Sequence, residues 1–162
     1  MQIPSFLFRN LIGLAVFSAV SIGFLSSCQT EGCTDPMSDN YDADADKDDG
    51  SCIPWRDKFI GNYSGKNACT GSADQDVSIV INESGTTEDG MVITVTGAGL
   101  IFTAKVTAQE GITVPSQTIT YQSAAADISG SGTISNDSEL TINYNLVAGP
   151  VTTPCTLTAT KL

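Results

Sequence analysis

The segment from Leu140 to Leu146 reads LTINYNL, and its apolar residues alternate strictly with Thr and Asn. Alternation with a period of two is typical of a β-strand that buries one face. A first strand is expected at 59–64, and the same rhythm recurs in the segments 77–82, 93–96, 100–106, 128–134 and 155–159. No stretch has the periodicity of a long helix. The chain is therefore predicted to be all-β from Trp55 onward.

Short turn signals separate these strands, at Gly85, Asp89-Gly90, Gly97-Ala98-Gly99, Glu110-Gly111, Asn136-Asp137 and Gly149-Pro150. Strands joined by such turns form antiparallel hairpins. About eight strands in a meander hide their edges most economically by closing into a barrel. We expect a closed barrel over residues 55–162, with an open two-sheet β-sandwich as the alternative.

Several residues of this domain are assigned roles by their position. Trp55, Phe59 and Tyr63 are expected to fill the core or plug one end. Phe102, Ile142 and Tyr144 would line a lumen that could bind a small apolar ligand, if the interior is open. Gly130 and Gly132 share one strand face, which predicts close approach of another chain segment or sharp coiling, and less favourably a ligand.

The segment KFIGNYSG, residues 58–65, resembles the first strand of lipocalin-like barrels, in which a Gly-x-Tyr or Gly-x-Trp element bends in at the barrel floor. The resemblance implies a lipocalin-like barrel.

The N-terminal residues have the features of an export signal. Arg9 precedes an uncharged apolar run over 11–25, about 15 residues, which is shorter than the roughly 20 needed to span a bilayer. Ser26 and Ser27 then precede Cys28, an arrangement that resembles the bacterial lipobox. The resemblance implies cleavage after residue 27 and attachment of Cys28 to the membrane through long acyl chains such as palmitate. Gln29 follows where Asp would favour the inner membrane, so the outer membrane is the expected location, in either leaflet; an ordinary signal with an unmodified Cys28 is the alternative.

The cysteine count agrees with a lipid-modified Cys28. The chain has five cysteines, and lipidation of one leaves Cys33, Cys52, Cys69 and Cys155, an even set that can pair fully in an oxidising compartment. Cys69 follows the predicted first strand and Cys155 lies in the last, so a bond between them would join the two ends of the sheet. Other pairings remain open at this point.

An acidic loop lies between Cys33 and Cys52. It contains seven Asp residues, and Asp42, Asp44, Asp46 and Asp48 alternate with other residues. A bent loop could direct these carboxylates, together with Asp49, toward one Ca²⁺ ion, which takes six to eight oxygen ligands. A solvated acidic spacer is the alternative.

Three short motifs identify this loop further: GCTD at 32–35, NY at 40–41 and DDGSC at 48–52. Together they resemble a small module of secreted and surface proteins of Gram-negative bacteria, and more distantly the Asp-rich calcium repeats of thrombospondin type 3. The resemblance implies a Cys33–Cys52 disulfide and is compatible with calcium. Residues 28–54 are therefore predicted to be an anchor linker and an acidic disulfide module, behind a signal peptide at 1–27.

Composition excludes several functions. Without Arg9 the chain carries 6 basic and 18 acidic residues, a formal charge of −12, which disfavours nucleic acid as a partner. Histidine is absent, which removes Ser-His-Asp and His-metal chemistry, and no spacing nominates a catalytic carboxylate pair. We expect a non-catalytic surface lipoprotein whose barrel binds a small apolar ligand or another surface protein. The alternative is a structural or adhesive module with a filled core and a calcium-stiffened stalk.

Overall fold

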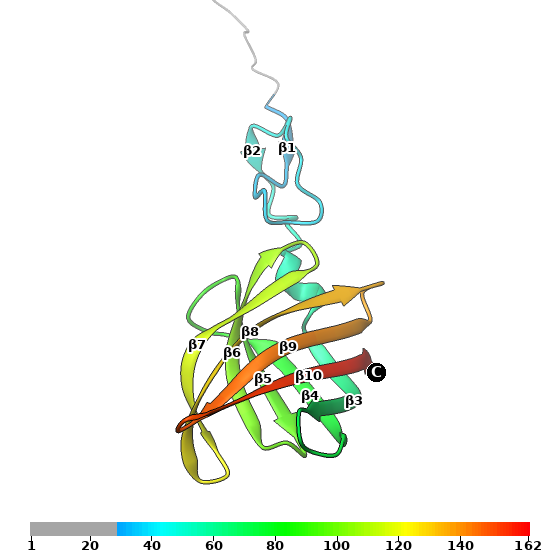
Figure 1. The fold of residues 1–162 in the computed structure, drawn as a ribbon. Helices are drawn as coiled ribbons and strands as arrows, with labels where there is room; N and C mark the ends of the chain where they lie inside the picture. The colour runs from blue at the N-terminus through cyan, green and yellow to red at the C-terminus, as the bar shows by residue number, and fades with distance from the viewer. Residues whose placement is uncertain (1–28) are drawn as a thin grey trace, which may run out of the picture.

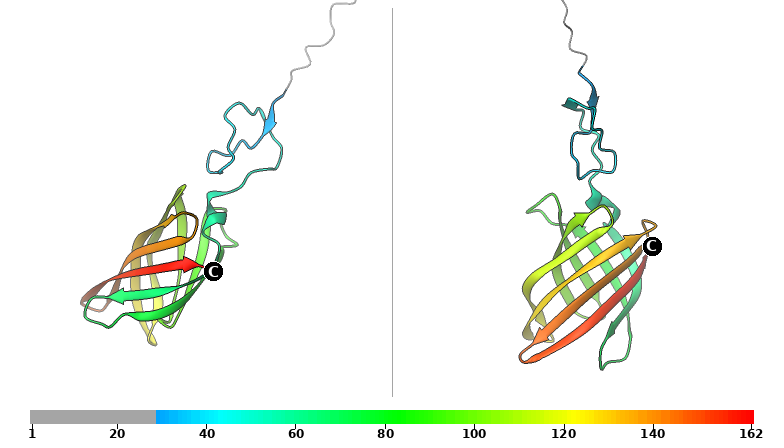
Figure 2. Two further views of the ribbon diagram at one scale, coloured as in Figure 1. Left: turned by 90° about the vertical axis from the view of Figure 1, so that its right-hand side faces the viewer. Right: turned by 45° about the horizontal axis from the view of Figure 1, so that its top comes forward.

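The computed structural model describes residues 29–162. Within this range a small acidic module, residues 29–54, precedes a β-barrel, residues 55–162 (Figure 1). The N-terminal end of the described chain lies on the side of the module that points away from the barrel, as the two further views also show (Figure 2). Cys28 lies outside the described residues, so its lipidation stays a prediction.

The barrel has eight antiparallel strands, each paired with its neighbours in sequence, and β10 closes the ring by pairing with β3. This confirms the closed meander, and the sandwich alternative is wrong. The strands are β3 (Gly61–Cys69), β4 (Gln75–Glu83), β5 (Gly90–Thr96), β6 (Leu100–Ala108), β7 (Gly111–Tyr121), β8 (Ala124–Ser135), β9 (Glu139–Ala148) and β10 (Val151–Lys161).

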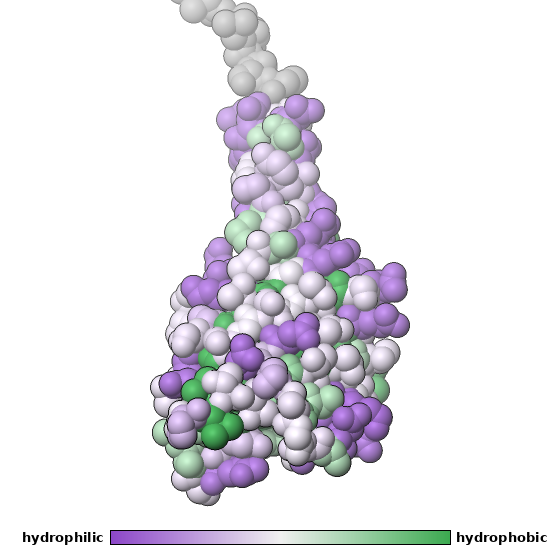
Figure 3. Space-filling model, viewed as in Figure 1, coloured by the Kyte–Doolittle hydropathy of each residue, from purple (hydrophilic) through white to green (hydrophobic). Residues whose placement is uncertain are grey.

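Apolar and polar residues alternate along the strands, so most of the apolar side chains point into the barrel and most of the polar side chains point to the surface. On β6, the side chains of Leu100, Phe102 and Val106 are at most 3% exposed, whereas Ile101 between them is 61% exposed. The outward positions elsewhere are mainly Thr, Ser, Asn and charged residues, so the surface is largely hydrophilic or neutral (Figure 3). Burial of the inward apolar side chains is the main force that stabilises the barrel.

The first strand differs from its predicted bounds, 59–64. A 3₁₀ turn, η1 (Trp55–Lys58), comes first, and β3 then runs through Cys69. The sequence after Ser64 lacks apolar alternation, yet it pairs with β10 because Gly65 permits a close approach: a Cβ there would lie 2.0 Å from the carbonyl oxygen of Thr158. The prediction that Cys69 follows the strand is therefore wrong; it ends the strand.

One of the eight barrel strands, β7, is not indicated by the sequence pattern. Its alternation is broken at Pro115, and its pairing register with β8 shifts between Val114 and Gln117. The side-chain amide of Gln117 substitutes for part of the ladder, accepting the Thr103 N–H at 2.9 Å and donating to the Thr103 carbonyl at 2.8 Å. A β-bulge of this kind hides the period of two.

Closure of the barrel brings Cys69 and Cys155 directly opposite each other, with their Cα atoms 4.1 Å apart, and they form a disulfide as predicted. The close approach predicted at Gly130 is also present, since a Cβ there would lie 2.2 Å from the Asn143 carbonyl oxygen on β9. The close main chain of β9 therefore explains this glycine.

The acidic module has little regular structure. A short parallel pair, β1 (Glu31–Gly32) and β2 (Lys47–Asp48), lies beside the Cys33–Cys52 disulfide that the resemblance implied. The one helical segment between residues 29 and 162 is a single short turn, and no helix there is long and apolar enough to cross a membrane.

Phe59 and Tyr63 are fully buried, and Trp55 is partly buried against the same core. Their predicted role in the core or plug is confirmed. Tyr63 donates a hydrogen bond to the Phe59 carbonyl at 2.8 Å, and burial raises its pKa to about 12. The three aromatic residues therefore belong to the part of the core where η1 leads into β3.

Candidate functional site

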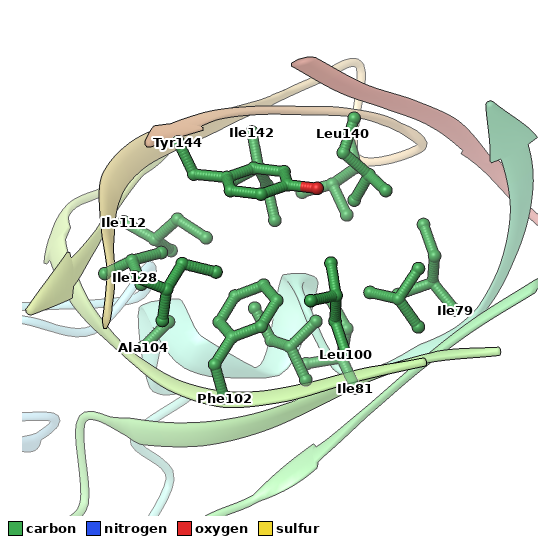
Figure 4. Packing of buried hydrophobic residues seen from close by; sticks show 14 of the residues in the cluster. Ile79, Ile81, Leu100, Phe102, Ala104, Ile112, Ile128, Leu140, Ile142 and Tyr144 are labelled. Atoms are coloured by element: carbon green, nitrogen blue, oxygen red, sulfur yellow. The ribbon is translucent and has the colours of Figure 1, made fainter. Parts of the chain in front are cut away.

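The residues expected to line a lumen lie inside the barrel, with Phe102 on β6 and Ile142 and Tyr144 on β9. Strands β6 and β9 are separated by β7 and β8 on one side and by four strands on the other, so they face each other across the interior. The ring centroids of Phe102 and Tyr144 are 6.3 Å apart, a distance at which aromatic side chains pack together. Side chains from opposite walls therefore meet at this level (Figure 4).

A polar contact crosses this apolar interior. The hydroxyl of Tyr144 donates a hydrogen bond to Oδ1 of Asn67 at 2.8 Å, and Asn67 is only 5% exposed. Burial raises the pKa of Tyr144 to about 12, so its hydroxyl is neutral at ordinary pH. The Tyr144 hydroxyl and the Asn67 side-chain oxygen are hydrogen-bonded to each other, so neither of these buried polar atoms is left unpaired. The contact joins β9 to β3.

The candidate calcium ligands do not converge. Asp42, Asp48 and Asp49 each accept a hydrogen bond at 2.9 Å from the backbone N–H two residues ahead, and the hydrogen bonds from Ser51 lower the pKa of Asp49. In the part of the chain that the structure describes, no three His, Cys, Asp or Glu side chains gather where they could hold a metal ion. The local geometry therefore does not fit a calcium site, and calcium binding by Asp42, Asp44, Asp46, Asp48 and Asp49 stays a prediction.

The acidic module is joined to the barrel by contacts of Asp39. Its carboxylate lies 3.0 Å from the Lys58 ammonium on η1 and accepts a hydrogen bond at 3.0 Å from the side chain of Gln109, in the turn between β6 and β7. Partial desolvation acts to raise the pKa of Asp39, but the hydrogen bonds from Lys58 and Gln109 and the positive charge of Lys58 lower it overall. One carboxylate thus contacts two separate elements of the barrel.

Backbone and amide contacts fix the segment that enters the barrel. The side chain of Asn40 donates to the Ser51 carbonyl at 2.7 Å and accepts the Ile53 N–H at 2.8 Å. The Trp55 N–H then donates to the Met37 carbonyl at 3.0 Å. The acidic module and the barrel are therefore linked by an ordered connection.

A hollow of about 700 Å³ lies at this junction. We name it the joint hollow. Its walls come from the acidic module, from η1, from the loop between β4 and β5, and from β6. The lining residues are Asp35, Met37, Asp48, Cys52, Pro54, Trp55, Arg56, Thr87, Glu88, Asp89 and Val106. This volume is in the range of small-molecule sites.

The joint hollow has no recognisable signature in the sequence. Its residues come from four stretches, 35–37, 48–56, 87–89 and position 106, and no motif links them. The signals available were weak: Trp55 is the sole tryptophan, and Glu88 and Asp89 are adjacent acids in a turn. Only the docking of the acidic module on the barrel brings these stretches together.

A second depression, of about 580 Å³, lies on the outside of the barrel near the Cys69–Cys155 bond. Its rim carries neutral polar residues, including Ser131, Asn143 and Asn145. It contains no charged side chain and no aromatic residue besides Tyr144, which points inward. The joint hollow, with its mixed apolar and charged lining, is the stronger candidate site.

Comparison with known proteins supports the barrel fold and does not identify a specific function. No protein-family model matches this chain, and no curated protein matches it significantly. Among solved structures it is similar to EF1p2_mFAP2b bound to DFHBI, at 12% identity and a TM-score of 0.53 over 67% of this chain and 98% of the other. It is also similar to a redesigned β barrel, mFAP1, bound to DFHBI, at 13% identity and a TM-score of 0.51 over 65% and 97% of the two chains.

A natural protein with a similar structure comes from Bacteroides fragilis and is provisionally described as an outer membrane protein. It is 20% identical with a TM-score of 0.51, and the match covers 68% of this chain and 54% of that one. Identities this low establish a shared barrel architecture alone.

Proposed function

We propose that this chain is a non-catalytic, exported lipoprotein that is anchored at the outer membrane through Cys28 and presents its barrel as a binding domain. The acidic module would hold the barrel away from the anchor, because the N-terminal end of the described chain lies on the side of the module away from the barrel (Figure 1). The observation that carries the proposal is the joint hollow, whose volume of about 700 Å³ suits a small ligand.

The hydrogen bonds at the junction support a preformed site. The Asp39–Lys58 pair and the Trp55–Met37 hydrogen bond hold two of its walls in place, so little conformational freedom is lost when a ligand binds. Two of the compared barrels are bound to DFHBI, which makes ligand binding by a barrel of this architecture reasonable. The interior is a weaker candidate, because Phe102 and Tyr144 meet across it.

Native mass spectrometry of the full chain, purified in detergent from its own host, tests this proposal. We expect a retained small molecule on the unmodified protein. Thr87 is an exposed residue that lines the joint hollow, so Thr87→Trp should fill the space and remove the adduct. Ser72→Trp, in the exposed turn between β3 and β4, is the matched control and should keep it. An adduct that survives Thr87→Trp, or no adduct on any form, overturns the proposal.

The second candidate is a structural or adhesive module, and the packing of Phe102 against Tyr144 favours it. In that case the barrel is a solid spacer and the joint hollow has no ligand. Calcium titration of the full chain, followed by amide chemical shifts of residues 42–49, tests the calcium-stiffened form of this candidate. Shifts that saturate at millimolar calcium would support it, and unchanged shifts would remove the metal from it.

A further inference from the structure

The lining of the joint hollow is unbalanced in charge. Asp35, Asp48, Glu88 and Asp89 contribute carboxylates and Arg56 is the only basic lining residue. The Arg56 guanidinium lies 3.2 Å from the Glu83 carboxylate and donates to the Glu88 carbonyl oxygen at 2.7 Å. Its charge is thus already matched by Glu83, which does not line the hollow. Within residues 29–162, none of the four lining carboxylates forms an ion pair.

Apolar and polarisable groups form another part of the lining. Trp55 packs against the barrel core, Val106 is 3% exposed, and Met37 is 41% exposed. The face of a tryptophan ring attracts cations, and the Met thioether is a polarisable, adaptable contact. Asp35 and Asp48 accept backbone hydrogen bonds, but neither is paired with a cationic side chain among the described residues. An apolar wall beside carboxylates that form no ion pair suits a ligand with a positive charge on an apolar body.

Both kinds of group are held by the main chain. The Trp55 N–H donates to the Met37 carbonyl at 3.0 Å, and the Val106 N–H donates to the Asp89 carbonyl at 3.0 Å. The second bond fixes the acidic turn to the apolar wall of β6. The two parts of the lining therefore keep their spacing in the absence of a ligand.

We infer that the joint hollow binds a small organic cation with an apolar body, such as an alkylated ammonium ion. This inference rests on the proposed function, and it specifies the chemical class of the ligand. The formal charge of the chain, −11 over all residues, also attracts cations from a distance and repels anions.

The probe is choline, and its uncharged carbon isostere, 3,3-dimethylbutan-1-ol, is the matched control. Trp55 is the only tryptophan in the full chain, so its fluorescence reports binding directly. We expect a saturable change with choline, beyond that of sodium chloride at equal ionic strength, and at least threefold weaker binding of the isostere. Equal binding of the two, or no response to choline, would overturn the inference.

Methyl NMR of the full chain locates the bound probe. Met37 lines the joint hollow, whereas Met91 is fully buried in the barrel. Choline should shift the Met37 methyl signal and leave that of Met91 in place. A shift of Met91 alone would place the probe inside the barrel and overturn the inference.

Two double variants distinguish the effect of the lining carboxylates on choline binding from the effect of the net charge of the chain. Glu88→Gln with Asp89→Asn removes two carboxylates of the joint hollow. We expect roughly three- to tenfold weaker choline binding, because this is the attraction that two partly exposed charges contribute. Asp74→Asn with Asp127→Asn makes the same change in net charge at exposed positions outside the hollow and should have little effect. Equal weakening by both variants would mean that net charge alone attracts the probe.

The outcomes are distinguishable from failure of the proposed function. If the molecule retained from the host is neutral and is displaced by Thr87→Trp, the binding function stands and the cation inference fails. If nothing is retained but choline binds as described, the chemistry of the hollow stands and the proposed function fails.

Discussion

The acidic module and the barrel are stabilised by different interactions. Among the described residues, nearly all buried apolar side chains belong to the barrel, and the acidic module contributes only Cys33 to them. The module instead depends on the Cys33–Cys52 bond and on carboxylates that accept nearby backbone N–H groups. One region therefore folds by burying surface, and the other by restricting its unfolded chain.

The largest expected effect tests the barrel half of this comparison. Replacing the Cys69–Cys155 bond, which spans 86 residues, by alanines should lower the free energy of unfolding by about 4.5 kcal/mol in the chain-entropy description. The barrel should still fold, because its core and its strand pairing remain. Denaturation followed by circular dichroism measures this, and complete unfolding without denaturant would mean that burial is not the main stabilising force.

Removing the Cys33–Cys52 bond should have a smaller energetic effect and a greater structural one. The bond spans 19 residues and contributes about 3 kcal/mol to the module. With no core behind it, the module should lose its structure while the barrel remains folded. Amide signals of residues 31–48 should collapse to random-coil positions in Cys33→Ala with Cys52→Ala. Dispersed signals in this variant would show that contacts other than the disulfide suffice.

A third prediction concerns the buried polar contact of the barrel. Tyr144→Phe removes the hydroxyl that donates a hydrogen bond to Asn67. This should lower the free energy of unfolding by about 1–3 kcal/mol at neutral pH. Tyr41→Phe, in the acidic module at 47% exposure, is the control and should change little. Equilibrium denaturation of both variants checks the difference.

The same tyrosine makes the barrel sensitive to alkali. The pKa of Tyr144 is raised to about 12, whereas tyrosines of an unfolded chain ionise near 10. Ionisation therefore favours the unfolded chain: the contribution is fully present below about pH 10 and is lost as the pH rises toward 12. Tyr144→Phe should lose less stability over this window than the unmodified chain, and an equal loss would contradict the assignment.

The smallest effect is expected at the junction, where Asp39→Asn replaces the carboxylate that pairs with Lys58. Exposed pairs contribute about 1 kcal/mol or less, so the barrel should keep its stability while the module gains freedom to move relative to it. Residual dipolar couplings of the two regions measure this, with Asp57→Asn on η1 as the control. Unchanged relative alignment would show that the other contacts hold the junction.

Acid should have the same effect on the junction as Asp39→Asn. The pKa of Asp39 is lowered in the folded protein, so the contribution of its carboxylate is present above the usual Asp pKa, 3.8, and is lost as the pH falls through the lowered value. The junction thus weakens in acid, and the barrel in alkali.

Prediction from sequence was reliable where one local rule sufficed. The alternation in 140–146 predicted strand β9, and the turn signal at Asn136-Asp137 coincides with two residues of positive φ, near 50°, in the hairpin that precedes it. Prediction was poorer where tertiary contacts replaced the local rule. The bulge at Pro115 concealed β7, and the pairing of β10 with 65–69 lengthened β3 beyond its apolar alternation.

The sequence by itself determined the strand periodicity, the number of cysteines and the acidic character of the module. These follow from the spacing of residue types, because each is a property of a short segment or of a count. Tertiary structure alone decided that Phe102 and Tyr144 meet across the interior and that Met37, Trp55 and Glu88 share one hollow. The physical reason is distance along the chain: side chains contributed by remote segments become neighbours only after the barrel closes and the acidic module docks on it.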